Sequence, residues 1–273
     1  MIRADKMSNL KLTSGLKWSP LVDVIKYLLV ITGITWLLLN GTQKLGYNWQ
    51  WYRVPQYICQ VTDGGFISGP LLDGLMVTLH ITGISLILAF CFGLMAALLR
   101  LSDSFLGKIL ARGYVEIIRN TPLLVQLFFI YFVLSPVFDI NAFTSAVLAL
   151  SLFEGAYASE IFRAGIISIH KGQWEAAYSM GLNTYQTYRL IVLPQAIRHI
   201  LPPLTSQAVS LIKDSALVST IAIYDLTMRG QTIIAETFLV FEIWFTVAAL
   251  YLLVTLALSL TVNYMEKRFK IDY

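Results

Sequence analysis

Six long apolar runs divide the chain, and no other feature restricts its possible folds as much. A helix that crosses the hydrocarbon core of a bilayer needs about 20 mostly apolar residues. Because 57% of the 273 residues are hydrophobic and only 13% are charged, one soluble core cannot bury all of the apolar surface. The sequence therefore predicts an all-α membrane protein and argues against a soluble enzyme, a DNA-binding domain or a disordered chain. The six predicted transmembrane helices lie near residues 22–40, 71–99, 114–137, 142–163, 196–224 and 239–264.

The fifth run is the least hydrophobic of the six. It contains Gln207, Lys213 and Asp214 together with several Ser and Thr residues. Charged groups are costly near the centre of a bilayer, so they are rare in transmembrane helices. A pair of soluble helices beneath the membrane is therefore the alternative interpretation of residues 196–224.

Lysine and arginine residues alternate between the two sides of the predicted spans. They gather before the first run, after the second, between the fourth and fifth, and at the end of the chain. The other connections carry only Lys44, Arg53 and Arg229. Because basic residues accumulate on the cytoplasmic side, both termini and the loop 163–198 are predicted to be cytoplasmic. The same distribution explains the formal net charge of +4 without a nucleic-acid partner.

One membrane domain is expected, preceded by an extra helix. Residues 1–70 are predicted to form a cytoplasmic N-terminus, the first transmembrane helix and a periplasmic connection rich in Trp and Tyr, which are typical of a membrane interface. Residues 71–265 are predicted to form the five-span body with a cytoplasmic loop at about 166–195, and residues 266–273 a cytoplasmic tail. The halves of the body show no clear repeat, which argues against an inverted-repeat secondary transporter.

The loop between the fourth and fifth runs is too polar to span a membrane, but its pattern predicts helices. Residues 173–180 are compatible with a helix, and Gly181 is suited to a left-handed C-cap. Asn183 or Thr184 can cap a second short helix, which Pro194 is expected to end. The pattern leaves two interpretations open, an amphipathic helix on the lipid surface and a helix that fits a groove on a cytoplasmic partner.

The residues of this loop resemble the EAA loop of bacterial ABC importer permeases. That pattern reads E-A-A, three residues, G, nine residues, I-x-L-P, and the chain meets every fixed position. Residues 119–127 (Arg-Asn-Thr-Pro-Leu-Leu-Val-Gln-Leu) and 213–215 (Lys-Asp-Ser) are similar to the polar amino acid subfamily. The resemblance covers about residues 70–265. The matching positions in the loop are Glu175, Ala176, Ala177, Gly181, Ile191, Leu193 and Pro194.

The resemblance implies that the loop is a coupling helix, which would sit in a cleft of a separate ATP-hydrolysing subunit. Glu175 would complement the helix dipole or pair with a basic residue of the groove, and Trp174 would be one of the apolar anchors. Gly181 would set the angle of the turn. The chain lacks a phosphate-binding loop, since the Gly-Lys pair at 107–108 is followed by Ile109. No cofactor is therefore expected in this chain, and ATP and Mg²⁺ are expected on the ATPase subunit.

The polar residues of the fifth run are the candidates for substrate binding. Lys213 would meet the carboxylate of an amino acid, Asp214 its ammonium group, and Gln207 a polar side chain of the substrate. A local ion pair between Lys213 and Asp214 that fixes helix packing is the alternative. The resemblance favours the substrate role, and it adds Ser215, where Ser-Ala departs from the more usual Thr-Ser or Ser-Ser and would tune the accepted side chain.

Charged residues at the predicted cytoplasmic ends of the spans are interpreted as structural. Glu160 and Arg163 lie three residues apart on one helix face and are expected to pair with each other or with the ATPase-facing surface. Glu116 and Arg119 receive the same interpretation. Glu154 lies within an apolar span, where a gate and a packing role are equally compatible with the sequence. No spacing of residues suggests a metal site or a catalytic site.

These observations predict the permease subunit of an ATP-driven importer for a polar or charged amino acid in the bacterial inner membrane. The expected partners are a dimer of ATPase subunits, a second permease copy or a paralogue, a periplasmic or tethered binding protein, and lipid. An ion-coupled secondary transporter, an intramembrane enzyme and a channel component are the alternatives, and the EAA loop argues against all three. The sequence does not identify the amino acid.

Overall fold

The chain folds into two compact units, residues 1–49 and 50–273. The described part of the first unit contains the helix α1 (Pro20–Lys44), whose described hydrophobic side chains are mostly exposed. Its segment Val22–Gly41 is long and apolar enough to cross a membrane, as the first apolar run predicted. The predicted cytoplasmic segment before this helix lies outside the described residues. The computed structural model describes residues 20–44, 46–62 and 65–269.

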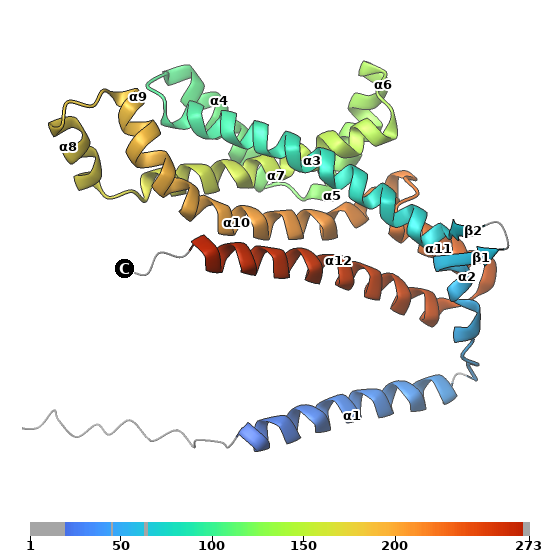
Figure 1. Ribbon diagram of the computed structural model, residues 1–273. Helices are drawn as coiled ribbons and strands as arrows, with labels where there is room; N and C mark the ends of the chain where they lie inside the picture. The colour runs from blue at the N-terminus through green and yellow to red at the C-terminus, as the bar shows by residue number, and fades with distance from the viewer. Residues whose placement is uncertain (1–19, 45, 63–64, 270–273) are drawn as a thin grey trace, which may run out of the picture. The chain divides into compact units, whose positions relative to one another are not determined.

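The second unit is a bundle of long helices with shorter pieces at its two ends (Figure 1). The long helices α3 and α7 pack side by side through two buried apolar clusters, to which α10 also contributes. The remaining long helix, α12, packs on the short helix α11 and on the start of α3. The long and intermediate helices are α3 (Pro70–Leu101), α4 (Phe105–Arg119), α7 (Ala142–Ile167), α10 (Leu193–Asp214), α11 (Leu226–Thr237) and α12 (Val240–Phe269).

The contact between α3 and α7 depends on small residues. A Cβ atom built on Gly93 of α3 would lie 2.9 Å from the Gly155 backbone oxygen and 2.7 Å from the Ala158 Cβ of α7. Only a glycine at position 93 therefore permits this separation of the two backbones. Close approach through small residues is a common way in which helices associate inside membranes.

The third predicted span, 114–137, is not one straight helix. The helix α4 and the run from Leu123 to Phe138 meet at an angle of 108°. The break occurs at Pro122, which lacks an N–H donor and disfavours a helical conformation in the residue before it. The Gln126 side chain compensates, because its Nε2 donates to the carbonyl oxygens of Ile118 and Thr121 at 2.7 and 3.0 Å. The bent run consists of α5 (Leu123–Phe128), the π-helical turn η2 (Phe129–Leu134) and α6 (Ser135–Phe138).

The described part of the chain contains four helices that are long and apolar enough to cross a membrane, or five if the bent pair is one span. The helix α10, which covers much of the fifth predicted span, is too polar to be counted among them. Beyond Asp214 that span continues as a 3-10 helix, η4 (Ser215–Ile221), and Ala222 then adopts a left-handed conformation with φ of 59°. The count of six spans stays a prediction.

A short segment before α3 adds a small β-hairpin to the all-α architecture that the sequence predicts. It comprises the 3-10 helix η1 (Trp51–Arg53), α2 (Pro55–Ile58) and the antiparallel hairpin β1 (Cys59–Thr62) and β2 (Gly65–Ser68). The Gln50 N–H donates to Glu242 Oε1 of α12 at 2.6 Å, and the Gly69 N–H donates to the Ile58 carbonyl at 2.8 Å. These contacts join the segment to the bundle, and the compact unit that contains the bundle begins at Gln50.

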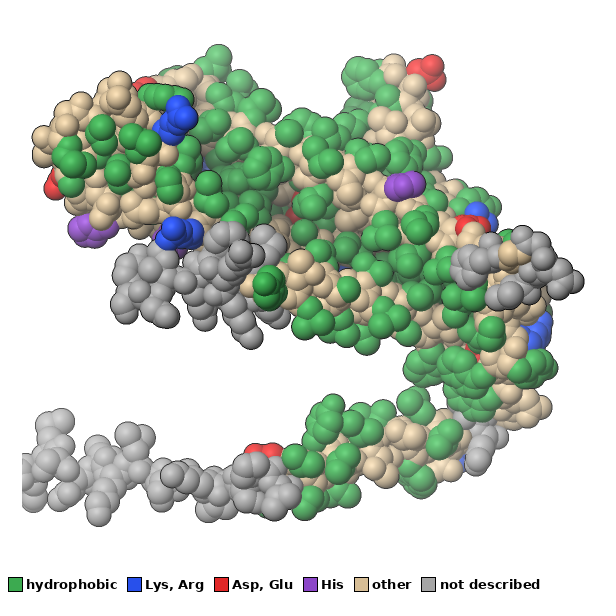
Figure 2. Space-filling model, in the orientation of Figure 1, with side chains coloured by type: hydrophobic (Ala, Val, Ile, Leu, Met, Phe, Trp, Pro, Cys, Tyr) green, Lys and Arg blue, Asp and Glu red, His purple; other side chains and the backbone are tan. Residues whose placement is uncertain are grey.

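The surface of the second unit has the polarity expected for a lipid-facing protein. Figure 2 shows hydrophobic side chains over most of the visible middle of this unit, with charged side chains mainly toward its two ends. Large hydrophobic side chains of α3 and α12 are exposed, among them Ile87, Leu253 and Leu260. The helix α12 continues to Phe269, so the tail that was predicted to begin at residue 266 begins as helix.

Candidate functional site

The predicted coupling loop folds as a helical hairpin at one end of the bundle. Its first helix is α8 (Lys171–Ser179), close to the predicted range 173–180. The imidazole of His170 caps it, since His170 Nδ1 accepts a hydrogen bond from the Gly172 N–H at 3.1 Å. The sequence pattern alone does not reveal this role of His170.

Gly181 ends α8 as predicted. Its φ is +79°, in the left-handed region that favours glycine. The Leu182 N–H donates to the Ala177 carbonyl at 3.1 Å, and the Gly181 N–H donates to the Tyr178 carbonyl at 2.9 Å. This is the pattern of a Schellman C-cap, which reverses the chain directly after the helix.

Asn183 begins the return helix through a complete capping box. Its Oδ1 accepts from the Gln186 N–H at 2.9 Å, and the Gln186 side chain accepts from the Asn183 N–H at 3.0 Å. The prediction that Pro194 ends this helix is wrong. The chain passes from α9 (Thr184–Thr187) through the π-helical turn η3 (Tyr188–Val192) directly into α10. The wider π-turn lies just before Pro194 and accommodates its missing N–H and its ring.

The predicted coupling residues divide between an inner and an outer face of the loop. Ala177 is buried, and Trp174 packs edge-to-face on Tyr188 with 5.1 Å between the ring centroids. Both side chains therefore support the hairpin from within. The exposed residues of the loop include Glu175, Ala176, Tyr178, Met180 and Gly181, together with Leu193 and Pro194 at the start of α10. Ile191 is half-buried.

The polar residues predicted to bind substrate lie between α7 and α10 and include a partner that the prediction left open. The Gln207 side chain lies close to the Glu154 carboxyl, and the charge of Asp214 acts on the same group from farther along α10. Glu154 is 2% exposed, and its Oε1 has no hydrogen-bond partner among the described residues. Glu154 and Gln207 therefore lie together within the bundle, and half-buried Asp214 lies two turns farther along α10; these three residues are called the polar cluster below.

Lys213 and Ser215 differ from the other predicted binding residues. Lys213 is exposed, and in the described part of the chain neither it nor Asp214 takes part in an ion pair. A helix-fixing ion pair between them is therefore absent. The Ser215 side chain is buried, and its hydroxyl donates to the Ile212 carbonyl at 2.7 Å. This hydroxyl is thus occupied by its own helix.

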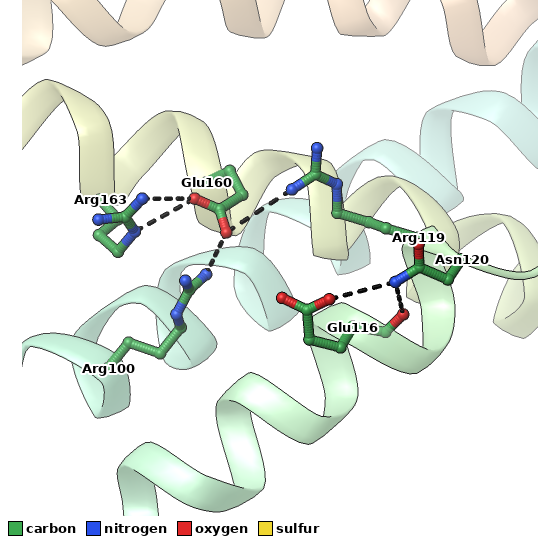
Figure 3. A network of polar contacts seen from close by, with 6 residues as sticks. All are labelled: Arg100, Glu116, Arg119, Asn120, Glu160 and Arg163. Atoms are coloured by element: carbon green, nitrogen blue, oxygen red, sulfur yellow. Dashed lines mark hydrogen bonds and ion pairs between the residues drawn. The ribbon is translucent and has the colours of Figure 1, made fainter.

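A second charged cluster, centred on Glu160, lies at the loop end of α7 (Figure 3). The predicted pair of Glu160 with Arg163 is present, with 2.8 Å between Arg163 Nη2 and Glu160 Oε2. Arg100 and Arg119 also contact Glu160. Glu116, by contrast, accepts from the Asn120 amide at 3.1 Å. Arg100, Arg119, Glu160 and Arg163 are called the Glu160 cluster below.

Comparison with known proteins finds a matching family and similar sequences. Residues 89–271 match the family model described as "Binding-protein-dependent transport system inner membrane component". The "Glutamine transport system permease protein GlnP" of Escherichia coli (strain K12) is 41% identical over 204 residues, which are 74% of this chain and 93% of that protein. The "L-cystine transport system permease protein TcyB" of Bacillus subtilis (strain 168) is 41% identical over 203 residues, 73% of this chain and 86% of that one.

A solved structure shares the fold. It is described as an amino acid ABC transporter with histidines, is 39% identical and superposes with a TM-score of 0.69 over 73% of this chain and 94% of the other. The family match covers well over half of the chain, and the aligned relatives are covered almost completely. The chain belongs to the family of binding-protein-dependent transport system inner membrane components.

Proposed function

We propose that this chain is the permease subunit of an ABC importer that moves a polar or charged amino acid across the bacterial inner membrane. The observation that carries the proposal is the capped hairpin between α7 and α10, which leaves the side chains of Glu175, Ala176, Tyr178 and Met180 exposed. A short helix that exposes apolar side chains beside a carboxylate suits a groove on a partner protein. The relatives named for glutamine and cystine transport support the substrate class.

ATP hydrolysis in this proposal belongs to a separate subunit. The sequence carries no phosphate-binding loop, and two ATPase subunits would each receive one coupling hairpin from a permease dimer. The dimer would contain either two copies of this chain or one copy and a paralogue. The hairpin and both termini would be cytoplasmic, and a periplasmic or tethered binding protein would deliver the amino acid from the opposite side.

The polar cluster between α7 and α10 is the proposed binding site for the amino acid. Carboxylates without ionic partners are expensive inside a membrane. Glu154 is buried and Asp214 is half-buried, which supports a role for both in holding the ammonium group of a substrate. Gln207 would complete the site by hydrogen bonding. Lys213 would meet the substrate carboxylate from the exposed side of α10, and Ser215 would shape the site through its buried position.

A charge reversal on the hairpin tests the proposal. Glu175→Lys should leave the permease inserted in the membrane but reduce the ATPase subunit that co-purifies with it in mild detergent. Glu236→Lys is the matched control, because Glu236 is also an exposed carboxylate but lies on α11, outside the hairpin. Equal recovery of an ATPase with both variants would contradict the coupling role. Uptake that needs an ion gradient and no ATPase would favour a secondary transporter.

A further inference from the structure

Three arginines from three helices converge on the single carboxylate of Glu160 (Figure 3). Arg100 lies in the last turn of α3, Arg119 is the last residue of α4, and Arg163 lies one turn after Glu160 on α7. The cluster therefore joins the ends of three helices at one point. Its three positive charges face one negative charge, so the arginines compete for Glu160.

The three contacts differ in strength. Arg100 Nη1 lies 2.5 Å from Glu160 Oε1, and Arg163 binds Oε2 through Nε and Nη2 at 3.1 and 2.8 Å. Arg119 Nη1 lies 3.7 Å from the oxygen that Arg100 already occupies, and its side chain is 43% exposed. Its guanidinium also lies over the Tyr157 ring, 5.1 Å from the centroid. Arg100 and Arg163 thus make the fixed contacts, and Arg119 makes the contact that can open at least cost.

Through Arg119, this weak contact lies between the bend at Pro122 and the end of α7 that leads into the hairpin. Three residues after Arg119, at Pro122, the chain turns by 108° into the α5–α6 run. On the other side of the contact, Glu160 lies two turns before the end of α7, where the hairpin containing α8 begins. A movement of α8 that shifts α7 relative to α4 would change the distance between Glu160 and Arg119. The same movement would act on the bend in the third predicted span.

We propose that Glu160 is a positioning residue for transport, and that its contact with Arg119 opens and closes as the coupling hairpin moves. This inference rests on the proposed function, because it assigns the hairpin to an ATPase partner. Arg100 and Arg163 hold Glu160 in place on α7 throughout the cycle. The Arg119 contact then transmits the state of the hairpin to the bend between α4 and α5.

The test compares two arginines of the same helix. Arg119→Gln removes the weak contact, whereas Arg112→Gln removes an exposed α4 arginine that forms no ion pair in the described part of the chain. Each variant is reconstituted with its ATPase subunits and binding protein in liposomes. The readouts are basal ATPase activity, substrate transported per ATP hydrolysed, and the melting temperature of the purified complex.

Arg119→Gln should raise basal ATPase activity and lower the substrate transported per ATP by about three- to fivefold, the size expected for the loss of one partly exposed ionic contact. Its melting temperature should match that of the wild type, and Arg112→Gln should be normal in all three readouts. Arg119→Lys should restore coupling to within about twofold of wild type, because a point charge can replace a contact that is not bidentate.

The inference is wrong if Arg119→Gln transports as much substrate per ATP as Arg112→Gln, or if Arg119→Lys is as uncoupled as Arg119→Gln. A fall in melting temperature without a change in substrate per ATP would assign Arg119 to packing alone and would also overturn it. Failure of the proposed function looks different, because the wild-type permease would then recruit no ATPase and stimulate none.

Discussion

The coupling role of the hairpin can be tested with substitutions at Gly181 that change the conformational preference of the backbone and remove no side-chain contact. With φ of +79°, Gly181 adopts a conformation that costs a residue with a side chain about 1–2 kcal/mol. A Cβ built there meets no atom within 4 Å, so the cost of Gly181→Ala is purely conformational. One to two kcal/mol corresponds to a factor of about 5–30 in the population of the capped hairpin.

A graded series separates this effect from side-chain bulk. Asn tolerates the left-handed region better than other residues with a side chain, so Gly181→Asn should lose less coupling than Gly181→Ala, although Asn is larger. Gly181→Val should lose the most, because a β-branched residue is a strong outlier in this region. Gly113→Ala serves as the control. Its added Cβ also meets nothing within 4 Å, but it lies inside α4, where alanine favours the helix.

Two measurements follow the series. Hydrogen–deuterium exchange of peptides covering α8 and Leu182 reports the population of the capped hairpin, and substrate transported per ATP in liposomes reports coupling. Both should fall in the order Gly, Asn, Ala, Val, while Gly113→Ala stays at the wild-type level. A Val variant with full transport, or an Asn variant that is worse than Ala, would refute the argument that the left-handed turn sets the coupling angle.

Three further predictions concern the bundle. Gly93→Ala should lower the free energy of unfolding by about 1–3 kcal/mol through overpacking between α3 and α7. Gly83→Ala on the same helix should not, because a Cβ built there meets nothing within 4 Å. Equal melting temperatures of the two variants would contradict this. Asp214→Asn should reduce uptake at least about tenfold, as expected for loss of a charged hydrogen-bond acceptor, without changing ATPase binding. The exposed control Asp139→Asn should take up substrate at the wild-type rate. Unchanged uptake by Asp214→Asn would assign Asp214 to a packing role. Burial raises the pKa of Asp225, which lies outside the predicted transmembrane helices, to about 6. The folded state therefore binds the carboxyl proton of Asp225 more tightly than the unfolded state does, so stability should fall as the pH rises from about 4 to about 6. In thermal unfolding, Asp225→Asn should abolish that fall. An unaltered pH profile in this variant would exclude Asp225 as the cause of the fall.

The local features of the hairpin were predictable because they depend on near neighbours in the sequence. Gly181 was identified as the C-cap and Asn183 as one of two possible N-caps, and both assignments are confirmed. The continuation of the second helix beyond Pro194 was not predicted, because a π-helical turn can absorb a proline and leaves no clear signal in the sequence. The inward packing of Trp174 on Tyr188 depends on how the two arms of the hairpin fold together.

The charged clusters were only partly predictable for the same reason. Glu160 and Arg163 lie one turn apart, so their pairing follows from helix geometry. Arg100 and Arg119 reach Glu160 only because α3 and α4 end beside α7, and no spacing in the sequence reveals that arrangement. The contact of Gln207 with Glu154 likewise joins residues more than 50 positions apart. Glu154, Glu160 and Gln207 stand out in the sequence as polar residues in apolar runs, but Arg100 does not, and most of the partners have no signal in the sequence.

The connection between α7 and α10 links the polar cluster to the hairpin mechanically. Glu154 lies 13 residues before the end of α7 at Ile167, and Gln207 lies 14 residues after the start of α10 at Leu193. At 1.5 Å per residue, both side chains are about 20 Å from the hairpin that joins their helices. They therefore face each other at the same height, which is why they can meet. A movement of the hairpin that changes the angle between the two helices would alter the separation of Glu154 and Gln207. Hairpin movement would then loosen the proposed substrate site directly, without any chemical step in this chain.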